Sequence, residues 1–298
     1  MRVRFTIPVL AAAAVLVLSG CVDNSTAPAS TATSGSAGTI EADSAAVALL
    51  PDGVGASGNL VFGTSPNYAP NEYKNDAGTP IGWTIDLSDA VAAKLGLTAD
   101  FTVANFESII PGIKGGSIDV GASSFTDNVE REKQVDFINY YEAGIQWASA
   151  AGTDVDPDNA CGLTVAVQAT TYQDTVEIPA KSEACVAAGL PPIDKKPYDT
   201  QDTAANAVVL GQAVAFSADS PVTLYAIDQL EGRLQLAGTS FEVAPYGFAV
   251  AKDSGMAEAV QAALQSLVDD GGYRAILDDW GVAAGGLDTI TINAAAQG

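Results

Sequence analysis

The chain has 298 residues, with 36 acidic and 13 basic side chains, so its formal net charge at pH 7 is −23. This charge disfavours nucleic acid and anionic membrane surfaces as partners, because both are negatively charged. Histidine is absent and there are three cysteines, so we expect neither a metal site nor a cofactor.

The first 20 residues have the pattern of a secretory signal peptide. Arg2 and Arg4 precede an apolar run over residues 7–18, which is too short to span a membrane. The run ends in Leu-Ser-Gly-Cys at 18–21, which resembles the bacterial lipobox. The resemblance implies cleavage before Cys21, lipidation of that cysteine and an extracytoplasmic protein anchored to the cell membrane by its N-terminal lipid. The alternative is an ordinary signal peptide followed by an incidental cysteine.

Residues 21–57 are predicted to be a disordered tether, because they are rich in Ala, Ser, Thr and Gly and lack sustained periodicity. Farther along the chain, Cys161 and Cys185 form an even pair in an exported protein. An oxidising compartment favours a disulfide between them.

From residue 58 the chain alternates strand and helix patterns, which predicts an α/β fold with helices covering a mostly parallel sheet. Strands are predicted at 59–63, 80–86, 99–104, 119–122, 143–150, 163–167, 213–217 and 241–250. Helices are predicted at 87–95, 106–113, around residue 131, at 256–267 and at 273–280. No packing signal follows residue 287, so residues 284–298 are predicted to be a tail.

Two strand-to-helix turns carry small hydroxyl residues. One holds Ser123, Ser124 and Thr126, with Arg131 on the helix that follows, and the other holds Thr170 and Thr171. Hydroxyls, helix-start N–H groups and a guanidinium suit a carboxylate, because arginine can hold both oxygens at once. The alternative is an ordinary helix cap with a solvated arginine. Since about 225 residues of α/β pattern suit two lobes, we expect the two turns to face each other across a cleft.

From residue 60 to 282 the chain resembles the family 3 extracellular solute-binding proteins, the polar amino-acid receptors of ABC importers. The motifs that carry the resemblance occur in the family's order at 63–70, 82–87, 106–113, 118–120, 130–137, 165–171, 218–222 and 246–250. The resemblance implies a two-lobed, type II periplasmic-binding-protein-like fold with the ligand in the interlobe cleft. Lobe 1 is expected to contain residues 58–143 and 246–283, and lobe 2 residues 144–245.

The resemblance also implies a role for each matching residue in binding an amino acid. The α-carboxylate is expected to lie at Ser124, Thr126, Arg131 and Thr171, the α-ammonium at Asp219, and the aliphatic part between Tyr68 and Phe106. These roles agree with the chemistry of a zwitterion, which needs donors at one end and an anion at the other. Asp219 has a helix-capping alternative, and the two aromatic residues have a core alternative.

Ser65, Asn71 and Trp83 complete the predicted pocket, but several positions depart from the family's pattern. Ser65 stands where the family often has an aspartate, which weakens the case for a ligand with a cationic side chain. Ser65, Asn71 and Thr84 suit an amide, a carboxylate or another polar head group. The sequence therefore leaves the ligand's side chain open.

The predicted function is that of a monomeric substrate-binding lipoprotein, which captures a polar or charged L-amino acid by lobe closure and delivers it to an ABC permease. No enzymatic activity is expected. One alternative is an enzyme on the same scaffold, such as a cyclohexadienyl dehydratase, although the lack of histidine and of a spare cysteine argues mildly against it. The other is a ligand-sensing surface lipoprotein.

Overall fold

The computed structural model describes residues 40–297, so the predicted signal peptide and Cys21 lie outside the described residues. The main sheet contains, in spatial order, β5 (Thr98–Val103), β1 (Asn59–Thr64), β6 (Val120–Thr126), β11 (Leu234–Ala251), β7 (Val135–Ala150), β10 (Ala215–Asp219), β8 (Thr164–Gln168) and β9 (Asp194–Tyr198). In addition, β12 (Gly286–Ile292) pairs with β7, and a separate small sheet holds β2 (Asn67–Tyr68), β3 (Glu72–Lys74) and β4 (Pro80–Ile81).

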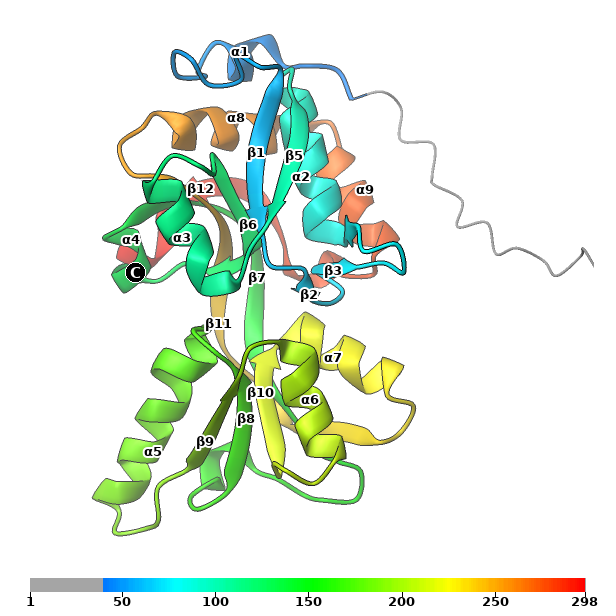
Figure 1. The fold of residues 1–298 in the computed structure, drawn as a ribbon, viewed down its shortest axis with the longest axis vertical. Helices are drawn as coiled ribbons and strands as arrows, with labels where there is room; N and C mark the ends of the chain where they lie inside the picture. Colours follow the sequence, from blue (N-terminus) through cyan, green and yellow to red (C-terminus); the bar gives the residue numbers. More distant parts are fainter. Residues whose placement is uncertain (1–39, 298) are drawn as a thin grey trace, which may run out of the picture. The chain divides into compact units, whose positions relative to one another are not determined.

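Helices flank this sheet on both faces (Figure 1). They are α1 (Ser44–Val47), α2 (Trp83–Lys94), α3 (Phe106–Lys114), α4 (Val129–Glu132), α5 (Ile178–Ala187), α6 (Gln201–Val209), α7 (Ser220–Gln229), α8 (Met256–Asp269) and α9 (Gly272–Asp279). A π-helical turn, Gln173–Glu177, leads into α5, and 3₁₀ turns lie at Pro157–Asn159, Ala283–Gly285 and Ala294–Gln297. No helix among residues 40–297 is long and apolar enough to cross a membrane.

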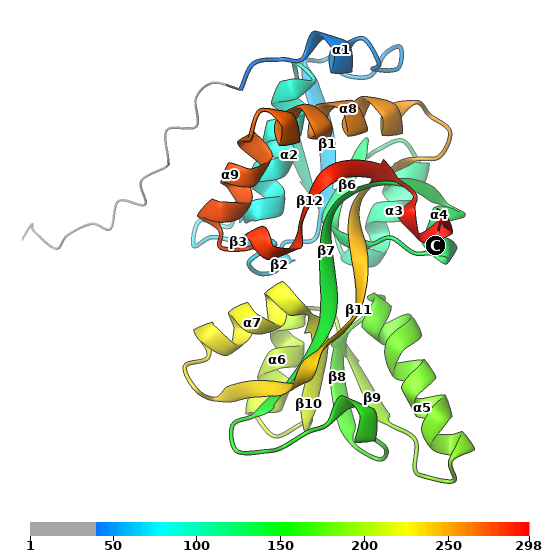
Figure 2. The ribbon, with the colours of Figure 1, turned by 180° about the vertical axis from the view of Figure 1, so that it is seen from behind.

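Two long antiparallel strands, β7 and β11, run through two groups of elements (Figure 2). We call lobe 1 the group around the parallel strands β1, β5 and β6, with α1–α4, α8, α9, the small sheet and β12. Lobe 2 is the group around the parallel strands β8, β9 and β10, with α5–α7. The pairing of β7 with β11 is irregular between Phe241 and Ala244. A Cβ on Gly144 would lie 2.2 Å from Ser240 Oγ, so glycine permits the close approach there.

The core of lobe 1 lies between the sheet and α2, α8 and α9. The predicted helix at 256–267 is present as α8, and Val260, Leu264 and Leu267 on one of its faces are buried. They belong to the same apolar cluster as Phe248 of β11. The 3.6-residue periodicity of the sequence therefore identified the helix face that packs on the sheet.

Lobe 2 has its own apolar cores on the two sides of β8 and β10. Phe216 lies in the cluster beneath α6, whereas Trp147 and Val165 lie in the cluster beneath α5. A disulfide joins Cys161, just before β8, to Cys185 of α5, which confirms the predicted bridge. The bridge ties α5 to the turn before β8 and restricts the unfolded chain.

The predicted strand at 80–86 is wrong beyond Ile81, because α2 begins at Trp83. Gly82 precedes the helix with φ +131°, and a Cβ there would lie 2.2 Å from the carbonyl oxygen of Asn71. Trp83, Thr84 and Ile85 are all buried. Because the first turn of α2 is buried on several sides, it has no amphipathic helical pattern. Its apolar and polar residues alternate instead, which is the pattern of a strand.

The predicted tether ends earlier than residue 57, because the chain is already folded from residue 40. Asp43 caps α1 by accepting hydrogen bonds from the N–H groups of Ala45 and Ala46. The Asp43 N–H donates to the carbonyl oxygen of Lys94 at 2.8 Å, and Ala46 is fully buried in the lobe 1 core. The residues that make these contacts with lobe 1 are small, so the composition of this segment resembled that of a linker.

The predicted tail at 284–298 is also wrong in part, because residues 286–292 form β12 against β7. Ile290 is buried, and its N–H donates to Gln265 Oε1 at 2.9 Å. Its carbonyl oxygen accepts from Gln261 Nε2 at 2.8 Å. Two glutamines of α8 thus supply hydrogen-bond partners to the backbone of an irregular strand. This contact is tertiary, so the local sequence does not predict it.

Candidate ligand-binding site

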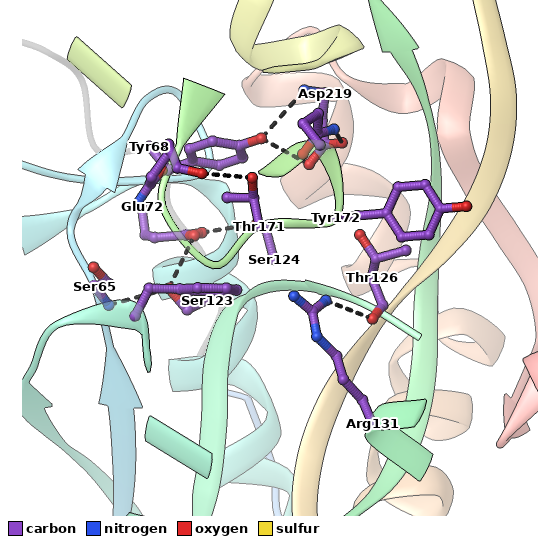
Figure 3. Close-up of a pocket in the computed structure, with 13 residues that line it drawn as sticks. Ser65, Tyr68, Glu72, Ser123, Ser124, Thr126, Arg131, Thr171, Tyr172 and Asp219 are labelled. Atoms are coloured by element: carbon purple, nitrogen blue, oxygen red, sulfur yellow. Dashed lines mark hydrogen bonds between the residues drawn. The ribbon is translucent and has the colours of Figure 1, made fainter. Parts of the chain in front are cut away.

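A small pocket lies between the ends of β6 and α4 in lobe 1 and of β8 and β10 in lobe 2 (Figure 3). The space open to the centre of a water molecule is about 20 Å³, which is room for about one water. The lining residues are Ser65, Tyr68, Glu72, Phe106, Ser123, Ser124, Thr126, Arg131, Gln168, Thr171, Tyr172, Gln173 and Asp219. Eight of the ten predicted ligand-binding residues are thus brought together.

Ser123 and Ser124 line the pocket at a point where the pairing of β6 is irregular. The register of β6 with β11 shifts between Gly247 and Ala249, and Ser124 has φ +45°. Such a φ is uncommon for a non-glycine residue, so surrounding contacts must hold it. Ser124 Oγ accepts from Asn71 Nδ2 at 3.0 Å, and Ser123 Oγ accepts from the Ser65 N–H at 3.1 Å. These bonds keep both hydroxyls at the pocket.

Arg131 supplies a fixed positive charge. Its guanidinium donates to the carbonyl oxygens of Thr126 in lobe 1, at 2.8 Å, and of Thr170 in lobe 2, at 3.2 Å. The guanidinium carbon also lies 5.5 Å from the centre of the Phe106 ring, within cation–π range. Burial lowers the pKa of Arg131 to about 10, so the group remains charged at neutral pH.

Asp219 supplies the negative charge from lobe 2. It precedes α7, but its side chain makes no capping hydrogen bond, so the capping alternative does not describe it. The carboxylate instead accepts from Tyr68 Oη at 2.8 Å, on one oxygen, and from Gln173 Nε2 at 2.8 Å, on the other. Burial raises the pKa of Asp219, and these hydrogen bonds act in the opposite direction.

The second hydroxyl turn closes the pocket from lobe 2. Thr170 has φ +64°, and its N–H donates to Asp174 Oδ2 at 2.8 Å. Asp174 forms a 2.6 Å salt bridge with Lys195. The hydroxyl of Thr171 donates to the carbonyl oxygen of Gln168 at 2.7 Å. The turn is therefore held by its own hydrogen bonds, with Thr171 lining the pocket.

Glu72 is a pocket residue that the sequence reasoning missed. Its side chain is fully buried, and it accepts hydrogen bonds from Ser124 Oγ at 2.9 Å and Ser123 Oγ at 3.3 Å. Burial raises its pKa to about 8, against the effect of these hydrogen bonds. The available signal was its position, two residues after Pro70 at the end of the loop that carries Tyr68.

Asn71 and Trp83 do not line the pocket, so ligand contact by these two residues stays a prediction. Both are fully buried in lobe 1. Trp83 Nε1 donates to Asn71 Oδ1 at 2.8 Å, and Asn71 Nδ2 donates in turn to Ser124 Oγ. They support Ser124 from behind, because a buried tryptophan needs an acceptor for its N–H. Besides Glu72, the lining residues missing from the predicted set are Ser123, Gln168, Tyr172 and Gln173.

Comparison with known proteins identifies the family. The family described as bacterial extracellular solute-binding proteins, family 3, matches residues 60–283, and the chain belongs to it. This result confirms the predicted family and, with the solved structures below, the two-lobed α/β fold.

Similarity extends along most of the chain. The arginine-binding protein ArgT of Corynebacterium glutamicum is 43% identical over 248 residues, which cover 83% of this chain and 82% of ArgT. A solved structure of an ancestral arginine-binding protein bound to arginine is 30% identical, with a TM-score of 0.68, and the match covers 75% of this chain and 98% of that one. The ancestral amino acid-binding protein AncCDT-1, a precursor of cyclohexadienyl dehydratase, is 29% identical, with a TM-score of 0.65 and coverages of 75% and 96%.

Proposed function

We propose that this protein captures a cationic L-amino acid, with arginine as the leading candidate, and delivers it to an ABC permease. The observation that carries the proposal is that Arg131 and Asp219 both line one pocket. They have opposite charges, come from opposite lobes, and neither forms a salt bridge within residues 40–297. Buried charges are costly without partners, and the two ends of an amino acid would supply both.

The α-carboxylate is assigned to Arg131, with Ser124, Thr126 and Thr171 as further donors. The α-ammonium is assigned to Asp219, where it would displace the hydrogen bonds that the carboxylate makes in lobe 2 and with Tyr68. The aliphatic part of the ligand would lie against the rings of Tyr68 and Phe106. These apolar walls exclude water and so strengthen both charged contacts.

Glu72 gives the proposal its preference for a cationic side chain. Ser65 removes the acid that the family often has at that position, but Glu72 places a buried carboxyl group in the same pocket. Its hydrogen-bond partners are hydroxyls, which do not neutralise a carboxylate. A guanidinium would, because its N–H groups match the two carboxylate oxygens. Relatives named as arginine-binding proteins support the same choice.

Binding requires the lobes to move apart and close again. The space of about 20 Å³ is far below the volume of an amino acid. Direct contacts between the lobes, such as Tyr68 to Asp219 and Arg131 to the Thr170 carbonyl, occupy the place of the ligand. Ligand contacts would replace them, and their differential strength would drive closure. A lipid anchor at Cys21, attachment to the cell membrane and a monomeric state remain parts of this proposal.

Calorimetry on the chain from residue 22 onward, with the common L-amino acids, tests the proposal. We expect arginine to bind and Arg131→Ala to weaken binding by about 2–5 kcal/mol, the range for truncating one side of a buried charged pair. Lys133→Ala is a matched control, because this substitution also removes one positive charge, two residues from Arg131. Lys133 is exposed and forms a salt bridge with exposed Glu130. Equal affinities for Arg131→Ala and the wild type would overturn the carboxylate assignment.

An enzyme remains the second candidate, because two observations favour testing it. AncCDT-1 is described as a precursor of cyclohexadienyl dehydratase, and the pKa of Glu72, about 8, keeps that acid protonated at neutral pH, as a general acid must be. Incubation with prephenate and arogenate distinguishes the two functions. Recovery of unchanged amino acid and unchanged prephenate supports a binding protein, whereas consumption of either cyclohexadienyl acid supports an enzyme.

A further inference from the structure

The end of the chain packs against the part of lobe 1 that carries Arg131. Strand β12 runs along β7 and ends beside α4 (Figure 2). The chain then continues through Asn293 into the 3₁₀ turn Ala294–Gln297. This segment lies beyond residues 60–283, which match the family. None of its residues lines the pocket.

Asn293 fixes the start of this segment on β7. Its φ is +53°, a backbone conformation that asparagine adopts more readily than most residues. Its N–H donates to the carbonyl oxygen of Phe137 at 2.9 Å, and its Oδ1 accepts from the Phe137 N–H at 2.8 Å. Its Nδ2 donates to Asp136 Oδ1 at 3.0 Å. Three hydrogen bonds therefore hold this residue, and we call residues 293–295 the C-terminal latch.

The C-terminal latch reaches the loop before α4 through two buried side chains, Asn139 of β7 and Asp127. The Ala294 N–H donates to Asn139 Oδ1 at 3.1 Å, and the Ala295 N–H donates to Asp127 Oδ2 at 3.4 Å. Asn139 Nδ2 donates to the same Asp127 oxygen at 2.9 Å. Buried polar groups need hydrogen-bond partners. Release of the latch would therefore remove a donor from both side chains.

Asp127 lies in the loop that sets the position of Arg131. The residue before it, Thr126, accepts from the Arg131 guanidinium on its carbonyl oxygen at 2.8 Å. The residue after it, Asn128, caps α4 by accepting from the Arg131 N–H at 2.9 Å. Helix α4 has four residues, which is too short to be stable by itself. Its position therefore depends on the contacts of this loop.

We propose that the C-terminal latch is a positioning element for Arg131, and that Asn139 and Asp127 are the positioning residues that connect the two. This inference rests on the proposed function, in which Arg131 binds the ligand's carboxylate. The latch holds the loop in place before the ligand arrives. Ordering a loop on binding lowers the affinity, so a loop that is already held binds more tightly.

The test uses two variants of the chain from residue 22 onward. One ends after Ile292 and so lacks the latch, and the other is Asn139→Leu, which keeps a side chain of similar size and removes its hydrogen bonds. Amide hydrogen exchange of the ligand-free protein, followed by mass spectrometry, measures the opening of the loop. We expect exchange at residues 126–134 to be about tenfold faster in both variants, with exchange in β1 and β5 unchanged, because the lost hydrogen bonds hold the loop and not the core.

Calorimetry then measures the affinity of each variant for the common L-amino acid that the wild type binds best. We expect both variants to bind it about tenfold more weakly. Gln261→Leu is the matched control, because Gln261 of α8 donates to the Ile290 carbonyl oxygen of β12 at 2.8 Å. This substitution removes a bond to the same strand and leaves the bonds of the latch in place. Its exchange at residues 126–134 and its affinity should equal those of the wild type.

The outcomes separate the latch from the proposed function. Unchanged exchange at residues 126–134 in either variant would overturn the latch, and if the shortened chain does not fold, Asn139→Leu alone decides. Faster exchange throughout lobe 1 would indicate a general loss of stability and would overturn the positioning role. Faster exchange at residues 126–134 with an unchanged affinity would overturn the link to binding. A folded wild type that binds no common L-amino acid would overturn the proposed function, whatever the exchange shows.

Discussion

Burial and ligand binding favour different protonation states of Glu72: burial favours the neutral acid, and a cationic ligand favours the carboxylate. Burial raises its pKa to about 8, with a further rise from nearby Asp219 and a reduction by the hydroxyls that donate to it. At pH 6 the carboxyl is therefore protonated before a ligand arrives. A cationic side chain favours the carboxylate, so binding must release this proton. We expect the affinity for arginine to rise with pH below about 8, by up to about tenfold per unit, and then to level off.

Calorimetry between pH 6 and 8.5, in buffers with different ionisation enthalpies, measures both the affinity and the proton released. Glu72→Gln should abolish the rise in affinity between pH 6 and 8, because a glutamine has no proton to release. Citrulline, which has no side-chain charge, should show no such dependence in the wild type. A flat profile for arginine would contradict the assignment of Glu72.

The sequence predicts site residues that belong to a recognisable local pattern, and it misses residues whose role depends on burial in the folded protein. Arg131 and Asp219 follow strand-to-helix patterns, where polar groups recur at the carboxyl ends of strands. Glu72 lies in no such pattern, and only the folded chain shows that it lacks a counterion. Gln168 does end a predicted strand, but only the folded chain shows that its side-chain oxygen lacks a donor. Trp83 belongs to one of the motifs, but in the structure it supports Ser124 through Asn71 and does not line the pocket.

At the scale of elements, β12 ties the end of the chain to lobe 1. It pairs with β7, and Ile290 reaches the core that α8 also covers. We expect Ile290→Ala to lower the free energy of unfolding by about 2–5 kcal/mol, the usual cost of removing a large apolar side chain from a core. Thr289→Ala, next to it and exposed, should change stability by less than about 0.5 kcal/mol.

Urea unfolding followed by circular dichroism measures both variants, with the midpoint and slope compared with those of the wild type. Similar midpoints for Ile290→Ala and Thr289→Ala would show that β12 adds little to the stability of lobe 1. The sequence could not predict this strand, because its pairing is irregular and side chains of α8 satisfy part of its backbone. By contrast, α8 itself was predictable, since its apolar stripe repeats at helical spacing.

At the scale of the whole described unit, the sequence predicts two lobes but not the contacts that join them. About 225 residues of α/β pattern suit two lobes, and two similar turns suggest a cleft between them. The contact of Tyr68 with Asp219 joins residues 151 positions apart. No local pattern specifies such a pair, since it depends on how β7 and β11 bend between the lobes.

Another contact between the lobes lies outside the pocket, so it allows lobe closure to be tested apart from the chemistry of the ligand. Tyr73 of β3 in lobe 1 and Tyr225 of α7 in lobe 2 have ring centres 6.0 Å apart. Trp280 packs edge-on against Tyr73 at 6.3 Å, and its Nε1 donates to Asp86 Oδ2 at 2.7 Å. An aromatic pair of this kind contributes about 0.5–1.5 kcal/mol, and this pair can form only when the lobes are together.

We therefore expect Tyr225→Ala to raise the ligand dissociation rate about two- to tenfold, with little change in the association rate, because the contact stabilises the closed form after the ligand has entered. Stopped-flow tryptophan fluorescence measures both rates, with Trp280 close to the contact. Leu224→Ala is the control, because Leu224 is the neighbouring residue on α7 and is 53% exposed. If the two variants dissociate at the same rate, the aromatic pair does not hold the lobes together, and closure depends on the contacts inside the pocket.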